Sequence, residues 1–211
     1  MFRVTVLAII AGYADTIGYL HLNAFAGLMT GNTILMGIEL ATAKYGQAAF
    51  HGAIIAMFLF GVIFGRIIVR AGLEVFRALM VTSGLLIVSS LSDKFWGALL
   101  LALGMGIQNS AANRFGGITL NHVFITGNLQ KIGEEFVSWM WPSPGKQVKR
   151  ESAIFALAWF GYALGAVAGA LVADFIDKPL IIAACILPFV MIIHESKANA
   201  DFSPARLMGG G

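Results

Sequence analysis

"LMTGNTILMGIE", residues 28–39, is a polar and helix-breaking stretch in a very apolar chain. Its centre is Thr-Gly-Asn, and it closes on a carboxylate. The chain repeats this pattern as "FITGNLQKIGEE", residues 124–135. Without a gap, the matched positions are Thr30-Gly31-Asn32 with Thr126-Gly127-Asn128, Gly37 with Gly133, and Glu39 with Glu135. A polar tripeptide that recurs in such a chain indicates a structural unit that occurs twice.

The composition indicates a membrane protein. The chain has 211 residues, of which 58% are hydrophobic and only 12% are charged, whereas soluble domains carry roughly 25% charged residues. Apolar stretches of about 20 residues, long enough to cross a bilayer, recur along the chain. The strict alternation of a membrane β-barrel is absent. We therefore expect an all-α polytopic membrane protein, and we expect its first apolar stretch to be a span and not a signal peptide.

Two further matches extend the repeat to nearly the whole chain. "GYAD" (12–15) matches "GIQN" (106–109) if two residues are inserted in the second copy, and "FGVIFG" (60–65) matches "FGYALG" (160–165). The sequence thus predicts one membrane domain made of repeat one, 1–92, and repeat two, 93–198, with a C-terminal tail, 199–211. The expected helical segments are 4–24, 28–43, 49–69 and 75–91, then 95–113, 125–140, 152–173 and 180–194.

The basic residues indicate how each repeat faces the membrane. In repeat one the basic residues cluster after the third segment of that repeat. In repeat two they cluster before the third segment of that repeat. The two clusters are Arg66, Arg70 and Arg77, and Lys146, Lys149 and Arg150. Because cytoplasmic loops hold the excess of Lys and Arg, the repeats must be inverted, and each must cross an odd number of times. We expect six full spans plus two re-entrant or broken half-helices, 28–43 and 125–140, with both termini cytoplasmic in a bacterial inner membrane.

The Thr-Gly-Asn tripeptides are predicted to line a site. Irregular backbone survives at membrane depth only when it is buried in protein or lines a wet cavity. Thr and Asn favour helix N-caps, so Thr30 and Thr126 are expected to start half-helices with N-termini that meet near the midplane. Such ends attract an anion or a hydrogen-bond acceptor. The alternative interpretation is that each tripeptide only packs at a turn of the chain and caps a helix, without lining a site.

Other polar residues accompany these corners. Asp15 lies within the first predicted span, where a carboxylate costs roughly 2.5 to 3.5 kcal/mol unless it is paired or wet. Its repeat partner is Asn109, and Gln108 precedes that residue. The predicted substrate-binding set is Asp15, Thr30, Gly31, Asn32, Gln108, Asn109, Thr126, Gly127 and Asn128. The alternative for Asp15 is a structural pair with a buried amide or Arg.

A second set of residues is a candidate gate or coupling group: Tyr19, His21, Glu39 and Glu135. Tyr19 lies one helical turn beyond Asp15 and can share its face. For His21 the alternative is a polar loop residue. For Glu39 and Glu135 the alternative is a position in the lipid headgroup region or an ion pair with basic residues of a loop.

No enzyme motif is present. The sequence lacks a His-Glu-x-x-His, Gly-x-Ser-x-Gly, Cys-x-x-Cys or phosphate-binding glycine pattern. The four histidines have no metal-ligand spacing, and the single cysteine, Cys185, forms no disulfide framework. We expect no metal, no cofactor and no nucleic-acid partner. The expected partners are the bilayer and a small solute, with a homodimer through the glycine faces of 49–69 or 152–173 as a further possibility.

At "GYADTIGYL…MTGN" and "GIQNSAANRF…ITGN" the sequence resembles the YoaK-type family of bacterial membrane proteins, a family of unknown function. The resemblance covers nearly the whole chain and implies a six-span inner-membrane protein, but it implies no substrate. From the residues we expect a channel or secondary transporter for a small polar or anionic solute. The alternatives are a non-transporting scaffold or regulatory partner, or an intramembrane enzyme that uses Asp15.

Overall fold

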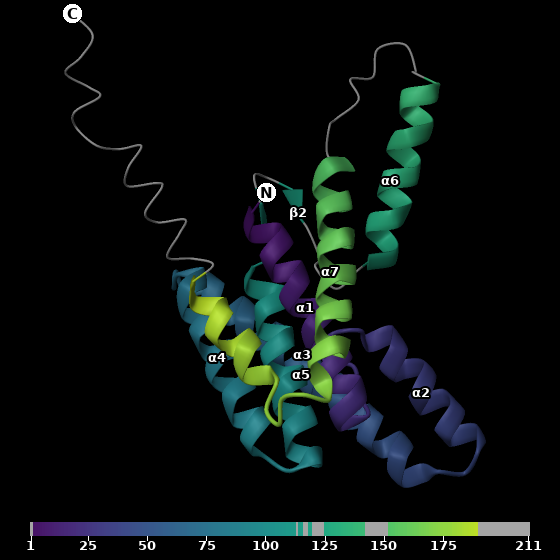
Figure 1. The fold of residues 1–211 in the computed structure, drawn as a ribbon, viewed down its shortest axis with the longest axis vertical. Coiled ribbons are helices and arrows are strands. Elements are labelled where there is room, and N and C mark those ends of the chain that lie inside the picture. Colours follow the sequence, from purple (N-terminus) through teal and green to yellow (C-terminus); the bar gives the residue numbers. More distant parts are fainter. Residues whose placement is uncertain (1, 113, 116–117, 120–124, 142–151, 190–211) are drawn as a thin grey trace, which may run out of the picture.

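The computed structural model describes residues 2–112, 114–115, 118–119, 125–141 and 152–189, and these form a helical protein (Figure 1). The helices are α1 (Phe2–Leu22), α2 (Met29–Ala41), α3 (Tyr45–Arg70), α4 (Val75–Leu91), α5 (Lys94–Ala111), α6 (Ile125–Met140) and α7 (Ser152–Ala173). A shorter helix, Leu180–Phe189, follows α7. Two short antiparallel strands, β1 (Arg114–Phe115) and β2 (Ile118–Thr119), form the only β-structure in the described part of the chain.

The helix bounds agree closely with the predicted segments. Helices α4, α6 and α7 have the predicted bounds, and the other labelled helices differ from theirs by a few residues. Three helices are long and apolar enough to cross a membrane, namely α1, α3 and the Ala153–Ala173 part of α7. The other three predicted spans stay a prediction. Residues 190–194, the loop with Pro142 and Pro144, the second basic cluster and the tail lie outside the described residues.

Two helix pairs pack through glycines at their closest points. A side chain at Gly165 would overlap the carbonyl oxygen of Ile9, so α7 lies directly against α1. In the same way, a side chain at Gly61 would overlap the carbonyl oxygen of Leu103, so α3 lies directly against α5. Lipid is as apolar as leucine, so helices in a membrane gain from such close approach more than from apolar burial. The small-residue stripes therefore join α1 to α7 and α3 to α5.

These contacts correct the register of the predicted repeat. Gly12 and Gly106 are repeat partners, and a side chain on either would overlap a carbonyl oxygen, that of Tyr162 or that of Phe58. The structure thus matches Phe58 with Tyr162 and Gly61 with Gly165. Under the predicted repeat, these contacts pair 60–65 with 164–169, which is one helical turn away from the predicted match with 160–165. The repeat itself stays a prediction. Glycines four residues apart make the two registers look alike in the sequence.

The same contacts occupy the glycine faces that were predicted to form a dimer. Gly61 and Gly65 of α3 pack against α5, and Gly161, Gly165 and Gly169 of α7 pack against α1, so these five glycines already have partners within the chain. A homodimer through another surface stays a prediction. The faces that α3 and α7 turn outward are apolar, with large side chains exposed at Leu59, Phe60, Ile63, Phe64, Ile67, Phe160, Leu164, Val167 and Leu171. Such faces suit contact with lipid.

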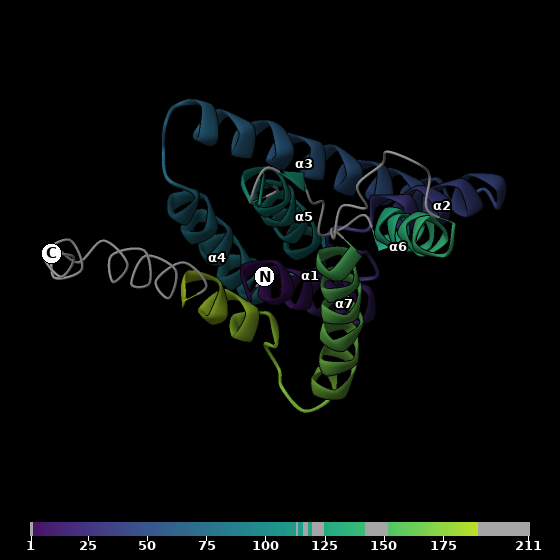
Figure 2. The same cartoon turned by 90° about the horizontal axis from the view of Figure 1, so that it is seen from above.

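The helices run in opposite directions in the two halves. In Figure 1, α1 and α7 run from the end near N toward the opposite end, and α3 and α5 run the other way. Seen from above, α7 stands beside α1, and α3 passes beside α5 (Figure 2). The short helices α2 and α6 lie on the same flank in both views. In Figure 1 they begin near the middle height of the molecule and run toward opposite ends.

Candidate functional site

The linker between α1 and α2 folds back along α1 and is held there by Asp15. The Asp15 carboxylate accepts hydrogen bonds from the backbone N–H of Gly27 at 2.6 Å and of Leu28 at 3.1 Å. Asp15 lies seven residues before the end of α1, which is about 10 Å along a helix. Helix α2 therefore begins at the depth of Asp15 and not at the end of α1.

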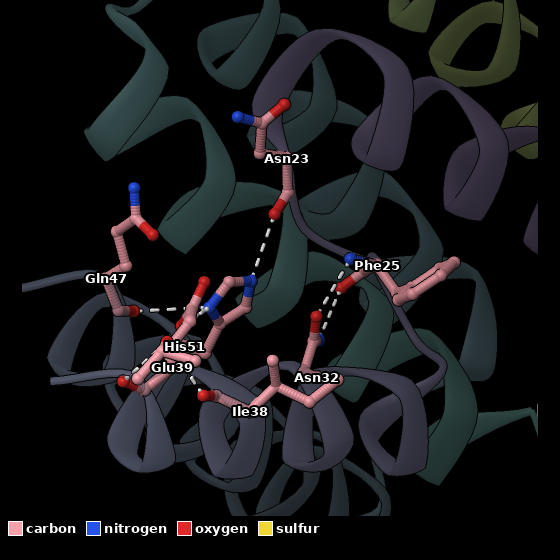
Figure 3. Close-up of polar contacts among 8 residues, drawn as sticks. Asn23, Phe25, Asn32, Ile38, Glu39, Gln47 and His51 are labelled. Atoms are coloured by element: carbon pink, nitrogen blue, oxygen red, sulfur yellow. Dashed lines mark hydrogen bonds and ion pairs between the residues drawn. The ribbon is translucent and has the colours of Figure 1, made fainter. Parts of the chain in front are cut away.

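Asn32 holds the same linker from the side of α2. Its side-chain oxygen accepts from the N–H of Phe25 at 2.9 Å, and its amide nitrogen donates to the carbonyl oxygen of Phe25 at 2.8 Å (Figure 3). Asn32 is fully buried. A side chain at Gly31 would come within 2.7 Å of the Phe25 ring, which stacks on Tyr19 with 4.8 Å between ring centroids. The conformation of the linker thus requires both the amide and the glycine of the tripeptide.

The threonine of the tripeptide does not start the helix. Helix α2 begins at Met29, its N-cap is Leu28, and no side chain caps it. Thr30 is the second residue of α2 and is exposed, and Thr126 has the same position in α6. The predicted N-cap role of Thr30 was therefore wrong. The turn before α2 is instead held by Asp15 and Asn32, which bond the backbone amides of residues 25, 27 and 28.

Asp15 also contacts a helix of the second half. Tyr162 of α7 donates a hydrogen bond to the other carboxylate oxygen of Asp15 at 2.6 Å. This carboxylate therefore accepts from two backbone amides and one hydroxyl. These partners compensate the cost of a buried charge. The amide partner agrees with the structural alternative for Asp15, although the amides are those of the backbone and no Arg takes part.

The corresponding residues of the second half have fewer partners among the residues that the structure describes. The side-chain oxygens of Gln108 and Asn109 and the amide nitrogen of Asn128 are buried, and none has a hydrogen-bond partner in the described part of the chain. Gln108 makes one long contact, from its amide nitrogen to the carbonyl oxygen of Leu7 at 3.5 Å. The residues that correspond to the linker 23–28 lie mostly outside the described ranges. Gly127 is half-buried at the start of α6.

A cavity of about 760 Å³, with both polar and apolar side chains in its wall, lies next to the first linker, where α1, α2, α3 and α5 meet. It is lined by Tyr19, Leu20, Asn23, Leu35, Glu39, Gly46, Gln47, Phe50, His51, Lys94 and Phe95. A second cavity of about 460 Å³, between α3, α4 and α5, is almost entirely apolar. Neither of these two cavities is lined by a residue of either Thr-Gly-Asn tripeptide.

His51 is the site residue that the sequence did not reveal. It is buried on α3, and its Nδ1 lies 2.7 Å from Glu39 Oε2 of α2 and 3.2 Å from the carbonyl oxygen of Gln47 (Figure 3). Its Nε2 lies 3.0 Å from the carbonyl oxygen of Asn23 at the end of α1. The signal in the sequence was weak, because twelve residues and a turn separate Glu39 from His51.

Two other predicted gate residues lie away from this cavity. His21 is exposed at the end of α1, and its Nε2 contacts the carbonyl oxygen of Ala173 at the end of α7 at 3.1 Å. Glu135 is half-buried on α6. Of the four gate candidates, the structure brings Tyr19 and Glu39 together at one cavity. No group of three or more metal-ligating side chains occurs among the described residues.

Comparison with known proteins supports the membrane assignment. Residues 4–193 match the model of a family described as "Protein of unknown function (DUF1275)". The chain belongs to this family. A DUF1275 relative, "UPF0700 transmembrane protein YoaK" of Bacillus subtilis (strain 168), is 30% identical over 185 residues, which are 79% of this chain and 81% of that protein. The predicted YoaK-type resemblance is thus confirmed. No solved structure matches this DUF1275 chain at a significant level.

Proposed function

We propose that the protein is a carrier for small polar or anionic solutes in the bacterial inner membrane. The observation that supports this most is the linker 23–28, which returns to the depth of the buried Asp15 beside a cavity lined by both polar and apolar side chains. Broken helices at the meeting point of two halves are a recurrent way in which transporters build a binding site. That the chain is not an enzyme stays a prediction.

The carrier is built, in this proposal, from two inverted repeats with six spans and two re-entrant helices. Helix α2 has 13 residues and is about 20 Å long, too short for a hydrocarbon core of about 30 Å. The opposite directions of α1 and α5, and of α2 and α6, agree with inverted halves (Figure 1). Helices α3 and α5 start at the end opposite N (Figure 1), and Lys44 and Lys94 are the residues at these two helix starts, so they would lie outside if the termini are cytoplasmic.

The closed corner of the first half favours a carrier over an open channel. Asp15 and Asn32 hold the linker through four hydrogen bonds to its backbone, and Tyr162 donates a fifth bond to Asp15. Solute in the cavity would pass this corner only after those bonds break. The buried amides Gln108, Asn109 and Asn128 receive the solute in the second half in this proposal, because each has a buried polar atom without a partner among the described residues. Movement of one corner at a time gives alternating access.

Uptake by purified protein in liposomes tests the proposal. The assay would use a panel of labelled carboxylates, amino acids and polyols, and would compare wild type with Asp15→Asn. The amide oxygen can still accept both backbone bonds, which share Oδ1, but the charge is lost and the amide nitrogen cannot accept from Tyr162. We therefore expect uptake to fall at least about tenfold. Asp93→Asn is the matched control, since Asp93 accepts from the N–H of Phe95 and Trp96 at the exposed start of α5. Equal uptake by Asp15→Asn and wild type, or no uptake of any solute, would refute a carrier.

A further inference from the structure

The cavity at the ends of α1, α2, α3 and α5 is lined by the ammonium group of Lys94 and by the hydrogen-bonded pair of Glu39 and His51. We propose that it binds a small carboxylate with an apolar tail, together with one proton held by the Glu39–His51 pair. The proposal rests on the carrier function and adds the class of solute and the coupling ion.

The proton follows from the hydrogen bonds of His51. Nε2 faces the carbonyl oxygen of Asn23, which can only accept, so Nε2 carries a hydrogen. Nδ1 faces Glu39 Oε2 at 2.7 Å. With a neutral ring and an ionised carboxylate, two lone pairs would oppose each other at that distance. A second proton must therefore lie between Glu39 and His51, on either partner.

Loss of this proton would weaken the contacts that hold α2 against α3. The side chains of His51 and Glu39 are 4% and 14% exposed, and both line the cavity, so the proton can exchange with its contents. The pair joins α2 to α3, and His51 also joins α3 to the start of the linker at Asn23. Without the proton, the facing acceptors repel, and α2 loses its polar contact with α3. The protonation state thus biases the position of α2.

The walls of the cavity select the solute. Its charged and titratable side chains come from each of the four helices around it: Tyr19, Glu39, His51 and Lys94. The proton on the pair compensates the charge of Glu39, which leaves the Lys94 ammonium as the net charge. Apolar side chains form the remainder of the wall, at Leu20, Leu35, Phe50 and Phe95. A volume of about 760 Å³ suits a small molecule, and this wall fits a carboxylate head beside Lys94 with a short apolar tail.

The charge of the solute fixes the sign of the coupling. A bound carboxylate adds negative charge next to the Glu39–His51 pair and favours its protonated form. By reciprocity, the protonated pair binds the carboxylate more tightly. Binding should therefore take up protons from solution, and the affinity should rise as the pH falls from about 8 to about 5.

Calorimetry on the purified full chain tests this site. Benzoate and hexanoate would be titrated across that pH range in two buffers of different ionisation enthalpy, which counts the protons taken up. We expect at least one probe to bind wild type with proton uptake, and Lys94→Met to weaken binding about tenfold. In Glu39→Gln the amide can still donate to Nδ1, so the α2–α3 contact stays while the exchangeable proton is removed. We expect this variant to bind without proton uptake.

The controls are charged residues outside the cavity. Lys44→Met, at the same end of the molecule, and Glu74→Gln, before α4, should bind the probes like wild type with the same proton uptake. Failure of both probes to bind wild type would overturn the proposal, as would equal binding by Lys94→Met or unchanged proton uptake in Glu39→Gln. Asp15-dependent uptake of polyols or amino acids together with no carboxylate binding would overturn it too, while leaving the carrier function in place.

Discussion

The hydroxyl of Tyr162 lies 2.6 Å from Asp15 Oδ2, and this contact joins α7 of the second half to the corner of the first. The corresponding pair in the other half is Phe58 and Asn109, which cannot form the same bond. The two halves therefore share the glycine packing of their helices but differ in the polar groups at their corners. This difference would allow one corner to hold while the other opens.

Removal of the Tyr162 hydroxyl should loosen this corner. A hydrogen bond to a charged group contributes about 1.5 to 3 kcal/mol, so Tyr162→Phe should lower the free energy of unfolding by that amount in detergent denaturation. Tyr45→Phe, at a residue that is 68% exposed, is the control and should have little effect. The double variant with Asp15→Asn should show a coupling of at least about 0.5 kcal/mol. Strict additivity would mean that the two side chains do not interact.

Hydrogen exchange should separate the roles of Asp15 and Asn32. Asp15 binds the amides of Gly27 and Leu28, and Asn32 binds the amide of Phe25. In wild type these three amides should exchange slowly although they lie outside a helix. Asp15→Asn should speed exchange chiefly at 27 and 28, and Asn32→Ala chiefly at 25. Fast exchange of all three in wild type would contradict the closed corner.

Glycine substitutions should distinguish helix contacts from exposed positions. A side chain at Gly165 would overlap the carbonyl oxygen of Ile9, so Gly165→Ala should force α7 away from α1 and lower the unfolding midpoint by several degrees. Gly37 has nothing within 4 Å of a built side chain. Gly37→Ala should thus leave the midpoint unchanged or raise it, because alanine favours the helix. A midpoint that falls equally in both variants would show that the α1–α7 crossing is not the cause.

The sequence allowed most helices and the central polar residues to be predicted, because apolar stretches and a buried carboxylate have strong patterns. It could not give the register of the repeat, since Gly61 and Gly65 match either Gly161 and Gly165 or the next turn. Only the contacts with Ile9 and Leu103 decide between these registers.

The partners of the polar side chains were harder to predict. Asn32 has an amide side chain of the kind that binds polar substrates, yet in the structure this side chain forms hydrogen bonds with the backbone of Phe25. Asp15 likewise contacts backbone amides across a linker whose path depends on tertiary packing. His51 drew no prediction because its partners, Glu39 and Asn23, come from two other elements. Side-chain pairs between segments leave no periodic signal in one sequence.

The central claim is that α2 is re-entrant. Labelling of the positions before and after α2, which shows the side of the membrane on which each lies, tests this claim most directly. In a Cys185→Ala background, single cysteines would replace Leu20 near the end of α1, Lys44 after α2, and Leu73 between α3 and α4. Cells would be treated with a membrane-impermeant maleimide before and after permeabilisation. A re-entrant α2 predicts that positions 20 and 44 label from the outside and position 73 only after permeabilisation. Labelling of positions 20 and 44 from opposite sides would show that α2 crosses the membrane and would contradict the account.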